Sequence, residues 1–442
     1  MSLNDATTTT EEESSSAITW EYQCVACGDD VRGRVALWWQ CPRCGRPLEL
    51  RRVQRGSGDI VDVSFPKELI STRPATMWRY REALALSRDA DVVSLGEGMT
   101  PLVALGGRDE ALASLLLKLD YAMPSGSYKD RGASMLVSAA HELGINAAVE
   151  DSSGNAGAAM AAYCARAAID IRIYAPLSTS TAKLTQIALH GASLHRVPGT
   201  RADTGRAVLD AARTTAYLSH NWNPFFIEGV KTVAFEICEQ LGWRAPDNVL
   251  APLGYGGIIL GLYRGFCDLE RAGVIERLPR IIGVQPASCN GLERAWAARW
   301  HEGEPQCNEP GDPPLPLSDD SSSTATTRTS CRYPSFVQTS DTLAEGIVAE
   351  TPIRPLSILR AISHTKGTIV SVSDEQVVDG LQRLASSGIF VEPTSAVVVH
   401  GFLTCLNEHR LIQATDCTVA ILSGSGLKAS SKLAELFSSH SR

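Results

Sequence analysis

Short apolar runs alternate with helical patterns over most of the chain. A strand is predicted at 114–119 and is followed by a helix at 129–143. The same alternation predicts strands at 146–150, 171–175, 248–253, 281–285 and 417–422, and helices at 156–168, at 182–189 and from 258. This order predicts an α/β fold of parallel or mixed sheets flanked by helices. Ligands of such sheets bind in the loops after the carboxyl ends of the strands.

Other stretches do not follow this alternation. Residues 1–18 are rich in Thr, Ser and Glu with almost no bulky apolar side chain, so we expect a disordered leader. Residues 19–50 hold two close cysteine pairs, and residues 51–95 form a connector with helical content. Residues 302–335 combine several prolines with a Ser/Thr-rich run, which indicates a low-complexity surface insertion.

The composition and charge indicate a globular protein and disfavour a nucleic-acid-binding or membrane-spanning one. Hydrophobic residues make up 44% of the 442 residues, which is typical of a globular chain of two or three domains. The net charge of -8 argues against a nucleic-acid partner. No apolar run reaches the ~18 residues of a membrane span, since Arg166 and Asp170 interrupt the best candidate. Without a signal-peptide pattern, a cytoplasmic protein is expected, and its scattered cysteines are expected to be reduced.

Four cysteines form two tight pairs, Cys24, Cys27, Cys41 and Cys44. A two-residue gap lets both sulfurs of a pair face one ion, and four thiolates complete a tetrahedral Zn²⁺ site. The spacing predicts a structural zinc ribbon, in which Val35, Leu37 and Trp39 alternate as in a hairpin strand. The alternatives are four metal-free cysteines, which would leave a module with little core, and a nucleic-acid role, which the net charge disfavours.

One lysine lies where a predicted strand gives way to a predicted helix. Lys129 follows several small hydroxyl residues in the stretch 124–132. The helix dipole and local burial are expected to lower the pKa of its ammonium group. Such a lysine can form an imine with a cofactor aldehyde. The alternative for a Lys-Asp-Arg run is a solvated helix face.

Three further loops follow predicted strands. Residues 151–157 offer backbone N–H groups and short polar side chains to a carboxylate or a phenolic oxygen, or else cap the next helix. Residues 252–257 contain glycines that let N–H groups approach a phosphate, or else form a tight turn. Residues 423–428 place a serine among glycines, which alone is an ordinary turn.

Together these loops resemble those of the fold-type II pyridoxal-phosphate enzymes, and among them the threonine synthases. The matching stretches are Ser-Tyr-Lys-Asp-Arg-Gly at 127–132, Ser-Ser-Gly-Asn at 152–155, the glycine loop at 252–257, Ser-Gly-Ser-Gly-Leu-Lys at 423–428, Trp-Arg-Tyr-Arg at 78–81, Leu-Gly-Glu-Gly-Met-Thr-Pro-Leu at 95–102, Glu-Gly-Val-Lys-Thr at 228–232 and Glu-Pro-Thr-Ser-Ala at 392–396. Some threonine synthase relatives also carry an N-terminal zinc ribbon. The resemblance covers residues 20–300 and 335–430.

This resemblance implies a two-domain architecture and a lyase activity. Residues 96–130 and 220–430 would form a large cofactor-binding domain, and residues 131–219 a small substrate-side domain. The cofactor would be pyridoxal 5'-phosphate, and the partner a small amino-acid substrate. Because dimers are common in the family, a homodimer is left open.

The resemblance also implies roles for single residues. Lys129 would bind the cofactor covalently and later move protons, Asn155 would hydrogen-bond the ring hydroxyl, and Ser423 would face the ring nitrogen. The loop of Gly254, Tyr255, Gly256 and Gly257 would hold the cofactor phosphate. Ser152 and Ser153 would help to seat the substrate carboxylate. A hydroxyl opposite the ring nitrogen suits elimination and replacement more than transamination.

The chain departs from the threonine synthase pattern at three positions. Threonine synthases tend to carry Thr at the position of Ala156, Arg at that of Phe226 and Asn at that of Tyr255. A bidentate contact from arginine to phosphate is worth on the order of 1.5–3 kcal/mol. We therefore expect a substrate other than O-phosphohomoserine, with a less charged side chain. The alternative is that a basic residue such as Lys183 or Arg166 replaces the missing arginine.

Several functions remain open at this point. The first is elimination or replacement on an amino-acid side chain, by a synthase or by a serine/threonine dehydratase-type lyase. A true threonine synthase is the second. The third is a non-catalytic, ribbon-bearing binding protein, which the intact Lys129, Asn155 and Ser423 disfavour.

Overall fold

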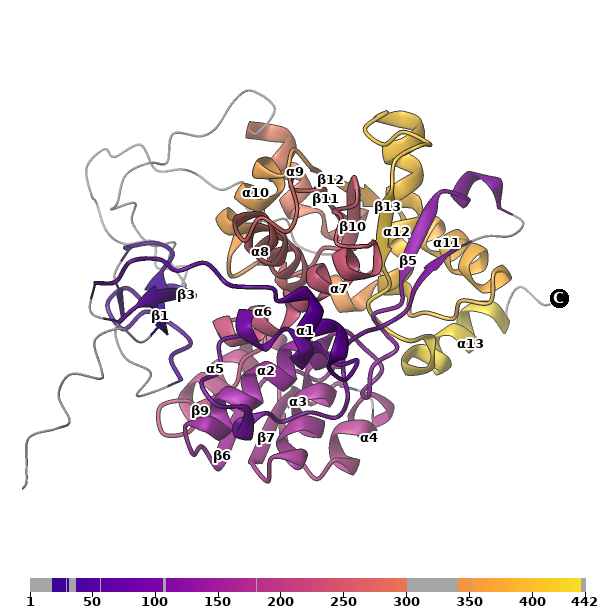
Figure 1. The fold of residues 1–442 in the computed structure, drawn as a ribbon. Helices are drawn as coiled ribbons and strands as arrows, with labels where there is room; N and C mark the ends of the chain where they lie inside the picture. The colour runs from indigo at the N-terminus through magenta and orange to yellow at the C-terminus, as the bar shows by residue number, and fades with distance from the viewer. Residues whose placement is uncertain are drawn as a thin grey trace, which may run out of the picture.

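The strands of the molecule form three separate sheets. The computed structural model describes residues 18–28, 30–31, 37–55, 57–105, 109–179, 181–299, 341–349 and 351–438. Within them, three strands form a small N-terminal sheet, four form a second sheet and six form a third. Figure 1 shows the four-stranded sheet at the bottom of the view, the six-stranded sheet above it and the small sheet to one side.

The four-stranded sheet is parallel, with the strand order β8-β7-β6-β9. Its strands are β6 (Ala147–Glu150), β7 (Asp170–Pro176), β8 (Ser193–Val197) and β9 (Ala216–Tyr217). The helices of this part are α2 (Lys129–Glu142), α3 (Asn155–Arg166), α4 (Thr181–Leu189) and α5 (Arg201–Ala211). Small side chains keep α3 narrow, so it is buried from Ala156 to Cys164 between α2 and β7.

The six-stranded sheet is mixed, with the order β12-β11-β10-β13-β5-β4. Its strands are β4 (Leu102–Ala104), β5 (Leu115–Lys118), β10 (Asn248–Pro252), β11 (Arg280–Pro286), β12 (Thr368–Val372) and β13 (Thr418–Ile421). Only β4 runs antiparallel to its neighbour among these pairs. The central strands β10 and β13 are buried at every residue, as is typical of parallel strands covered on both faces.

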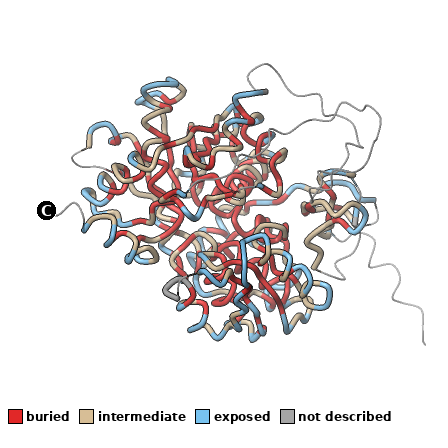
Figure 2. The backbone as a smooth tube through the Cα atoms, turned by 180° about the vertical axis from the view of Figure 1, so that it is seen from behind, coloured by how far each residue is buried: buried red, intermediate tan, exposed pale blue. Residues whose placement is uncertain are grey.

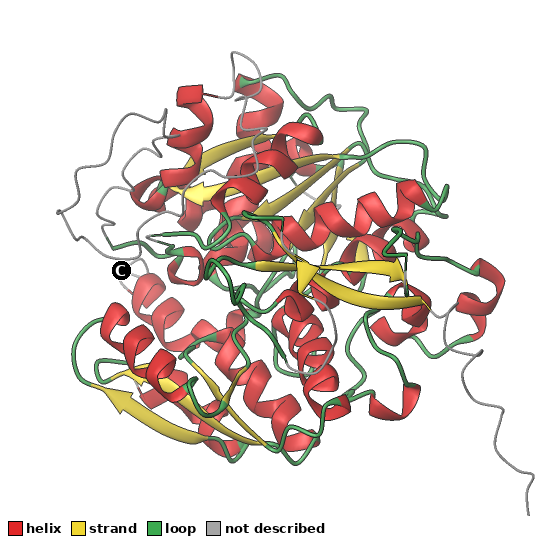
Figure 3. Ribbon diagram, turned by 90° about the vertical axis from the view of Figure 1, so that its left-hand side faces the viewer, coloured by secondary structure: helices red, strands yellow, loops and turns green. Residues whose placement is uncertain are grey.

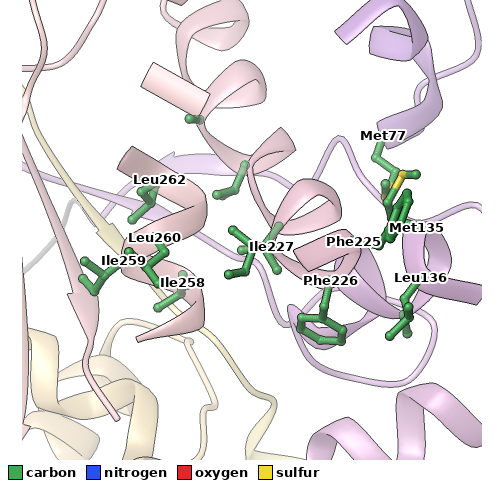
Figure 4. Close-up of a cluster of buried hydrophobic side chains, with 14 of the residues drawn as sticks. Met77, Met135, Leu136, Phe225, Phe226, Ile227, Ile258, Ile259, Leu260 and Leu262 are labelled. Atoms are coloured by element: carbon green, nitrogen blue, oxygen red, sulfur yellow. The ribbon is translucent and has the colours of Figure 1, made fainter. Parts of the chain in front are cut away.

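Helices cover both sides of this sheet (Figure 3). The helices from residue 224 onward are α6 (Pro224–Val230), α7 (Thr232–Gln240), α8 (Gly257–Arg271), α9 (Gly291–Arg299), α10 (Pro355–His364), α11 (Asp374–Ser386), α12 (Pro393–Leu403) and α13 (Ser430–Ser438). Figure 2 shows buried backbone running through both sheet regions. The apolar side chains of α2, α6 and α8 pack together where the two regions meet, with Phe225 and Phe226 pointing from α6 toward α2 (Figure 4).

The N-terminal sheet is antiparallel and holds the cysteine pairs. It consists of β1 (Ile18–Cys24), β2 (Asp30–Val31) and β3 (Leu48–Gln54). The strand β3 therefore runs past the boundary expected at residue 50, and β1 begins at the last residue of the expected leader. The predicted hairpin strand is wrong for Leu37 and Trp39, which lie in no strand.

The segment between the ribbon and β4 is irregular but well packed. It holds the short helix α1 (Lys67–Thr72) and two 3₁₀ turns (Met77–Ala83 and Asp89–Asp91). Further single turns are Glu110–Leu112, Ala287–Cys289, Glu345–Ile347 and Gly426–Ala429, and a π-helical turn spans Thr404–Glu408. These turns connect the regular elements without adding to the sheets.

The α/β fold class predicted from the sequence is confirmed. Each predicted strand and helix lies at its predicted place to within two residues, from β5 and α2 to β11 and β13. Within the described residues, no helix has both the length and the apolar character needed to cross a bilayer. Residues 1–17 of the expected leader, Val35 and the expected insertion at 302–335 lie outside the described residues.

Candidate active site

Lys129 and Ser423 lie in two loops that are hydrogen-bonded to each other. The Tyr128 N–H donates to the Ser423 carbonyl oxygen at 2.9 Å, and the Ser425 N–H donates to the Gly126 carbonyl oxygen at 3.0 Å. An isolated β-bridge between Ser127 and Gly424 completes the contact. The fold therefore brings the loop of Lys129 and the loop of Ser423 together, although these two residues lie 294 positions apart in the sequence.

Buried ion pairs hold the first turn of the helix that begins at Lys129, so this turn does not face solvent. Arg131 contacts Asp120 and Glu236, each at 2.5 Å, and all three side chains are fully buried. Burial would raise the pKa of Glu236, but Arg131 and the buried Lys118 lower it to about 2. The alternative of a solvated Lys-Asp-Arg face is therefore wrong, because this network fixes the first turn of α2 against β5 and α7.

The amine of Lys129 lies beside two aromatic rings. Its Nζ is 4.8 Å from the centroid of the Tyr128 ring and 5.7 Å from that of Phe226. Phe226 is buried in α6, where the Asn223 side chain accepts a hydrogen bond from the Phe225 N–H and Pro224 occupies the first turn. The position at which the resemblance implies an arginine thus presents an apolar ring to the lysine.

Asn155 contacts a carboxylate that sequence reasoning did not include in the site. Its Nδ2 is 3.1 Å from both carboxylate oxygens of Glu392. A side chain at Gly424 would overlap the same carboxylate, so Glu392 lies against the loop of Ser423. Burial raises the pKa of Glu392, while Asn155, Lys428 and Lys129 lower it in part. The Glu-Pro-Thr-Ser motif at 392–395 was the sequence signal for this residue.

Ser423 shares a hydrogen-bond cluster with a second serine that sequence reasoning also missed. Their Oγ atoms are 3.1 Å apart. The Oγ of Ser395 accepts hydrogen bonds from the N–H groups of Ser423 and Gly424, each at 2.9 Å. Both side chains are buried. The Ser423 hydroxyl is therefore held in one place at the carboxyl edge of the sheet.

The glycine loop leaves the neighbouring strand at the same edge. Leu250 of β10 pairs with Ala420 of β13, so the loops after both strands begin side by side. Gly256 has a φ of +85° and caps α8 without any side-chain hydrogen bond. A side chain at Gly257 would meet no atom within 4 Å. The N–H groups in the first turn of a helix have no partner within the helix, so the first turn of α8 beside this open space suits an anion.

The loop after β6 places its hydroxyl side chains close to α3. Ser152 is buried, Ser153 is half-buried, and the Ser152 carbonyl oxygen lies directly against Gly157. Ala156 is buried in the first turn of α3. Asp151, just before them, accepts hydrogen bonds from Arg201 at 2.9 Å and from the Tyr217 hydroxyl at 2.7 Å.

The four N-terminal cysteines converge on one point. The sulfur of Cys44 lies 3.4 Å from that of Cys24 and 3.6 Å from that of Cys27, and all four sulfurs lie within 4.8 Å of one another. Four sulfurs bound tetrahedrally to Zn²⁺ at ~2.3 Å lie about 3.8 Å apart. Burial raises the pKa of the Cys24 thiol to about 12, so a bound cation would be needed to ionise it at neutral pH. The donor set suits a metal ion.

The chain matches the model of one protein family over most of its length. Residues 93–424 match "Pyridoxal-phosphate dependent enzyme". The chain belongs to the pyridoxal-phosphate-dependent enzyme family. Threonine synthase of Methanocaldococcus jannaschii is 32% identical over 405 residues, which cover 88% of this chain and 92% of that protein. Threonine synthase of Mycobacterium bovis is 31% identical over 364 residues, which cover 80% and 89%.

Solved structures of the pyridoxal-phosphate enzymes share the fold. Threonine deaminase isoform 2 from Solanum lycopersicum has a TM-score of 0.59 at 19% identity, covering 85% of this chain and 91% of that chain. Maize serine racemase has a TM-score of 0.58 at 17% identity, covering 77% and 93%. The sheets flanked by helices thus match the fold-type II architecture.

The residues at the carboxyl edge fit the family's cofactor. Lys129 could supply an amine for the aldehyde, and the first turn of α8 could supply donors for the phosphate. The Oγ of Ser127, two residues before Lys129, is buried and has no hydrogen-bond partner among the described residues. An unsatisfied hydroxyl beside the lysine is expected where a polar group of a cofactor or substrate binds.

Proposed function

We propose that this pyridoxal-phosphate enzyme is a lyase that eliminates or replaces a group on the side chain of an amino acid, and that this group is not a phosphate. The buried Phe226 ring beside Lys129 is the observation that carries the proposal. An apolar ring offers a phosphate no hydrogen bond, and burial of a dianion against it would be costly. Ala156, also buried, offers no hydroxyl to replace the missing arginine.

Named residues would hold the cofactor. Lys129 would bind its aldehyde, Asn155 would face its ring hydroxyl, and the N–H groups of Gly254, Tyr255, Gly256 and Gly257 would hold its phosphate. Ser423, fixed by Ser395, would face the ring nitrogen. When bound, the cofactor supplies an electron sink that acidifies the α-proton of the substrate.

Side chains of the protein would bind the substrate, move the proton and exclude water. Ser152 and Ser153 would bind the substrate carboxylate beside the amino end of α3. The Lys129 amine would take the α-proton, and the Phe226 ring would exclude water from its surroundings. Glu392, which faces Asn155, would keep that amide oriented.

Of the two basic residues named as substitutes for the missing arginine, Arg166 lies too far away to fill its place. Arg166 is exposed at the last residue of α3, whereas Asn155 is the first residue of the same 12-residue helix. At 1.5 Å per residue the two ends of this helix lie roughly 16 Å apart. The side chain of Lys183 lies outside the described residues. Arg201 is engaged with Asp151, and the Lys428 amine donates to the Ser125 carbonyl and to Gln186.

A zinc ion held by Cys24, Cys27, Cys41 and Cys44 would have a structural role in the same proposal. The ribbon contacts the segment from β9 to α6 through Trp39. Its ring packs edge-to-face against those of Tyr217 and Trp222, with ring centroids 5.2 and 5.3 Å apart. Arg354 ties the two parts further, because it donates to carbonyl oxygens of Leu48 and Trp222. The metal would therefore stabilise the loop that leads into α6.

The experiment is a scan of amino acids against the purified holoenzyme, with the visible absorbance of the cofactor as readout. A hydroxy or acylated amino acid should change the spectrum and release a product, whereas O-phosphohomoserine should not. Lys129→Ala should abolish the covalent cofactor band. A wild-type protein that stays colourless with pyridoxal phosphate would support the non-catalytic binding protein instead. Release of ammonia and a 2-oxo acid would distinguish elimination from replacement.

A further inference from the structure

A histidine and a glutamate form a buried pair at the carboxyl edge of the four-stranded sheet. Glu150 is the last residue of β6, and His220 follows β9, which pairs with β6 in parallel. The His220 Nδ1 lies 2.5 Å from the Glu150 Oε1, with side-chain exposures of 9% and 0%. The second carboxylate oxygen of Glu150 has no hydrogen-bond partner among the described residues. Neither residue belongs to a motif that the sequence singles out.

This pair borders the candidate site across the ring of Phe226. The His220 ring centroid is 5.9 Å from the Phe226 centroid, in an edge-to-face arrangement. The Lys129 amine lies 5.7 Å from the same ring. The positive charge of Lys129 is one of the causes that lower the pKa of His220. His220 is therefore a polar group in the wall that otherwise presents Phe226.

The surroundings of the pair favour the neutral form of each group. Burial raises the pKa of Glu150 well above its usual value, with Asp151 adding to the rise and Arg201 opposing it. Burial lowers the pKa of His220, and Lys129 and Arg201 lower it further. A neutral Glu150 carboxyl then donates to Nδ1, which leaves the proton of the neutral imidazole on Nε2. The Tyr217 hydroxyl and the Cys164 thiol, both buried, are the other titratable neighbours.

The proposed reaction needs a proton at this place. A hydroxide or alkoxide leaves carbon poorly unless it is protonated as the bond breaks, and a positioned acid typically speeds such a step. The apolar Phe226 cannot supply this proton, and Lys129 is occupied with the α-proton. We propose that His220, oriented by Glu150, is the general acid that protonates the leaving oxygen of the substrate side chain; this inference rests on the proposed function.

The step balances as an acid–base reaction without any redox partner. The bond between the side-chain carbon and the leaving oxygen breaks, and its electron pair stays on the oxygen. The Nε2 proton of His220 forms the new O–H bond, and the Glu150 carboxyl proton moves to Nδ1. The imidazole stays neutral, and Glu150 becomes a carboxylate. Solvent returns one proton to the pair after Lys129 has released the α-proton to solvent.

The test compares leaving groups that need a proton with those that do not. The probes are L-serine against β-chloro-L-alanine, and L-homoserine against O-acetyl-L-homoserine, each with holoenzyme. His220→Asn should lower kcat on the hydroxyl substrates by about 10²–10³-fold and leave the chloride or acetate partner nearly unchanged. Glu150→Gln should lower the same activities as well, because an amide can orient the ring but has no proton to pass to Nδ1. His409→Asn, at an exposed histidine, is the matched control and should behave as wild type.

A second readout does not depend on turnover. In the cofactor-free protein, the proton held in the short bond between Glu150 and His220 should give a far-downfield resonance, which both variants should lose. An equal loss on both leaving groups, or a wild-type enzyme that uses only the activated substrates, would overturn the role of His220. Absence of the resonance from the wild type would overturn its orientation by Glu150. A wild-type enzyme inactive on all four probes would refute the proposed function itself.

Discussion

The ring of Phe226 lies directly on the backbone of Gly132, one helical turn after Lys129. A Cβ atom at position 132 would overlap the ring carbons of Phe226. The glycine therefore lets the aromatic ring approach α2 closely, and the ring in turn faces the lysine amine. The shape of the candidate site therefore depends on the lack of a side chain at position 132.

Gly132→Ala is expected to destabilise the protein although alanine is the better helix former. Overlap with a packed ring should lower the free energy of unfolding by about 1–3 kcal/mol. The matched control is Gly205→Ala in α5, where a Cβ meets no atom within 4 Å. That substitution should raise stability by roughly 0.5–1 kcal/mol. Urea unfolding of both variants checks the prediction, and equal stabilisation by both would contradict the observed contact.

Phe226→Arg should create a phosphate site where wild type has none. A charge-assisted contact of on the order of 1.5–3 kcal/mol corresponds to at least about a tenfold gain in affinity for O-phosphohomoserine. Phe226→Leu keeps the position apolar and serves as the control, with no gain expected. Spectral titration of the holoenzyme measures both. Equal affinities in arginine and leucine variants would show that position 226 does not meet the substrate side chain.

Removal of the metal should loosen the ribbon and its contact with the loop after β9. Cys24→Ser deletes one of the four converging sulfurs, so the purified protein should lose bound zinc and melt at a lower temperature. Cys417→Ser, at a half-buried cysteine outside the cluster, should do neither. Metal analysis and thermal melting provide the measurement. Full zinc content in Cys24→Ser would argue against this cluster as the ligand set.

Asp130 should make stability depend on pH. Burial raises its pKa from 3.8 to about 7, although Ser125 donates two hydrogen bonds to it. Between these two values the folded protein holds a proton that the unfolded chain has lost. The contribution of Asp130 to stability is therefore full below pH 3.8 and falls as pH rises toward 7.

The comparison of wild type with Asp130→Asn isolates this group. The wild-type free energy of unfolding should fall relative to that of the variant as pH rises from about 4 to 7, because asparagine cannot ionise. Unfolding by urea at several pH values measures the difference. A difference that stays constant over this range would mean that Asp130 ionises with an ordinary pKa in the folded protein.

The alternation of apolar runs with helical patterns was enough to predict the α/β fold, because strands such as β10 and β13 are buried on both faces and read as continuous apolar runs. The lysine and terminal serine loops could be predicted as neighbours, since both follow parallel strands. The conformation of Leu37 and Trp39 in the ribbon could not be predicted in this way. Trp39 packs against Tyr217 and Trp222, and this tertiary contact overrides the local alternation.

Contacts between distant segments account for the site residues that were missed. Glu392 reaches Asn155 across 237 positions, and His220 reaches Glu150 across 70. These pairs meet because of the strand order and the helices between the sheets, which local periodicity does not encode. The motif at 392–396 was visible as a resemblance, but its carboxylate had no assigned partner until the fold was known.

The most direct test of the account is the turnover of O-phosphohomoserine by the purified holoenzyme, measured as threonine and phosphate formed. Because Phe226, beside Lys129, and Ala156, in the first turn of α3, offer a phosphate no side-chain hydrogen bond, we predict no turnover above background, with activity on an amino acid that carries an uncharged leaving group. Conversion of O-phosphohomoserine to threonine at an ordinary enzymatic rate would contradict the account.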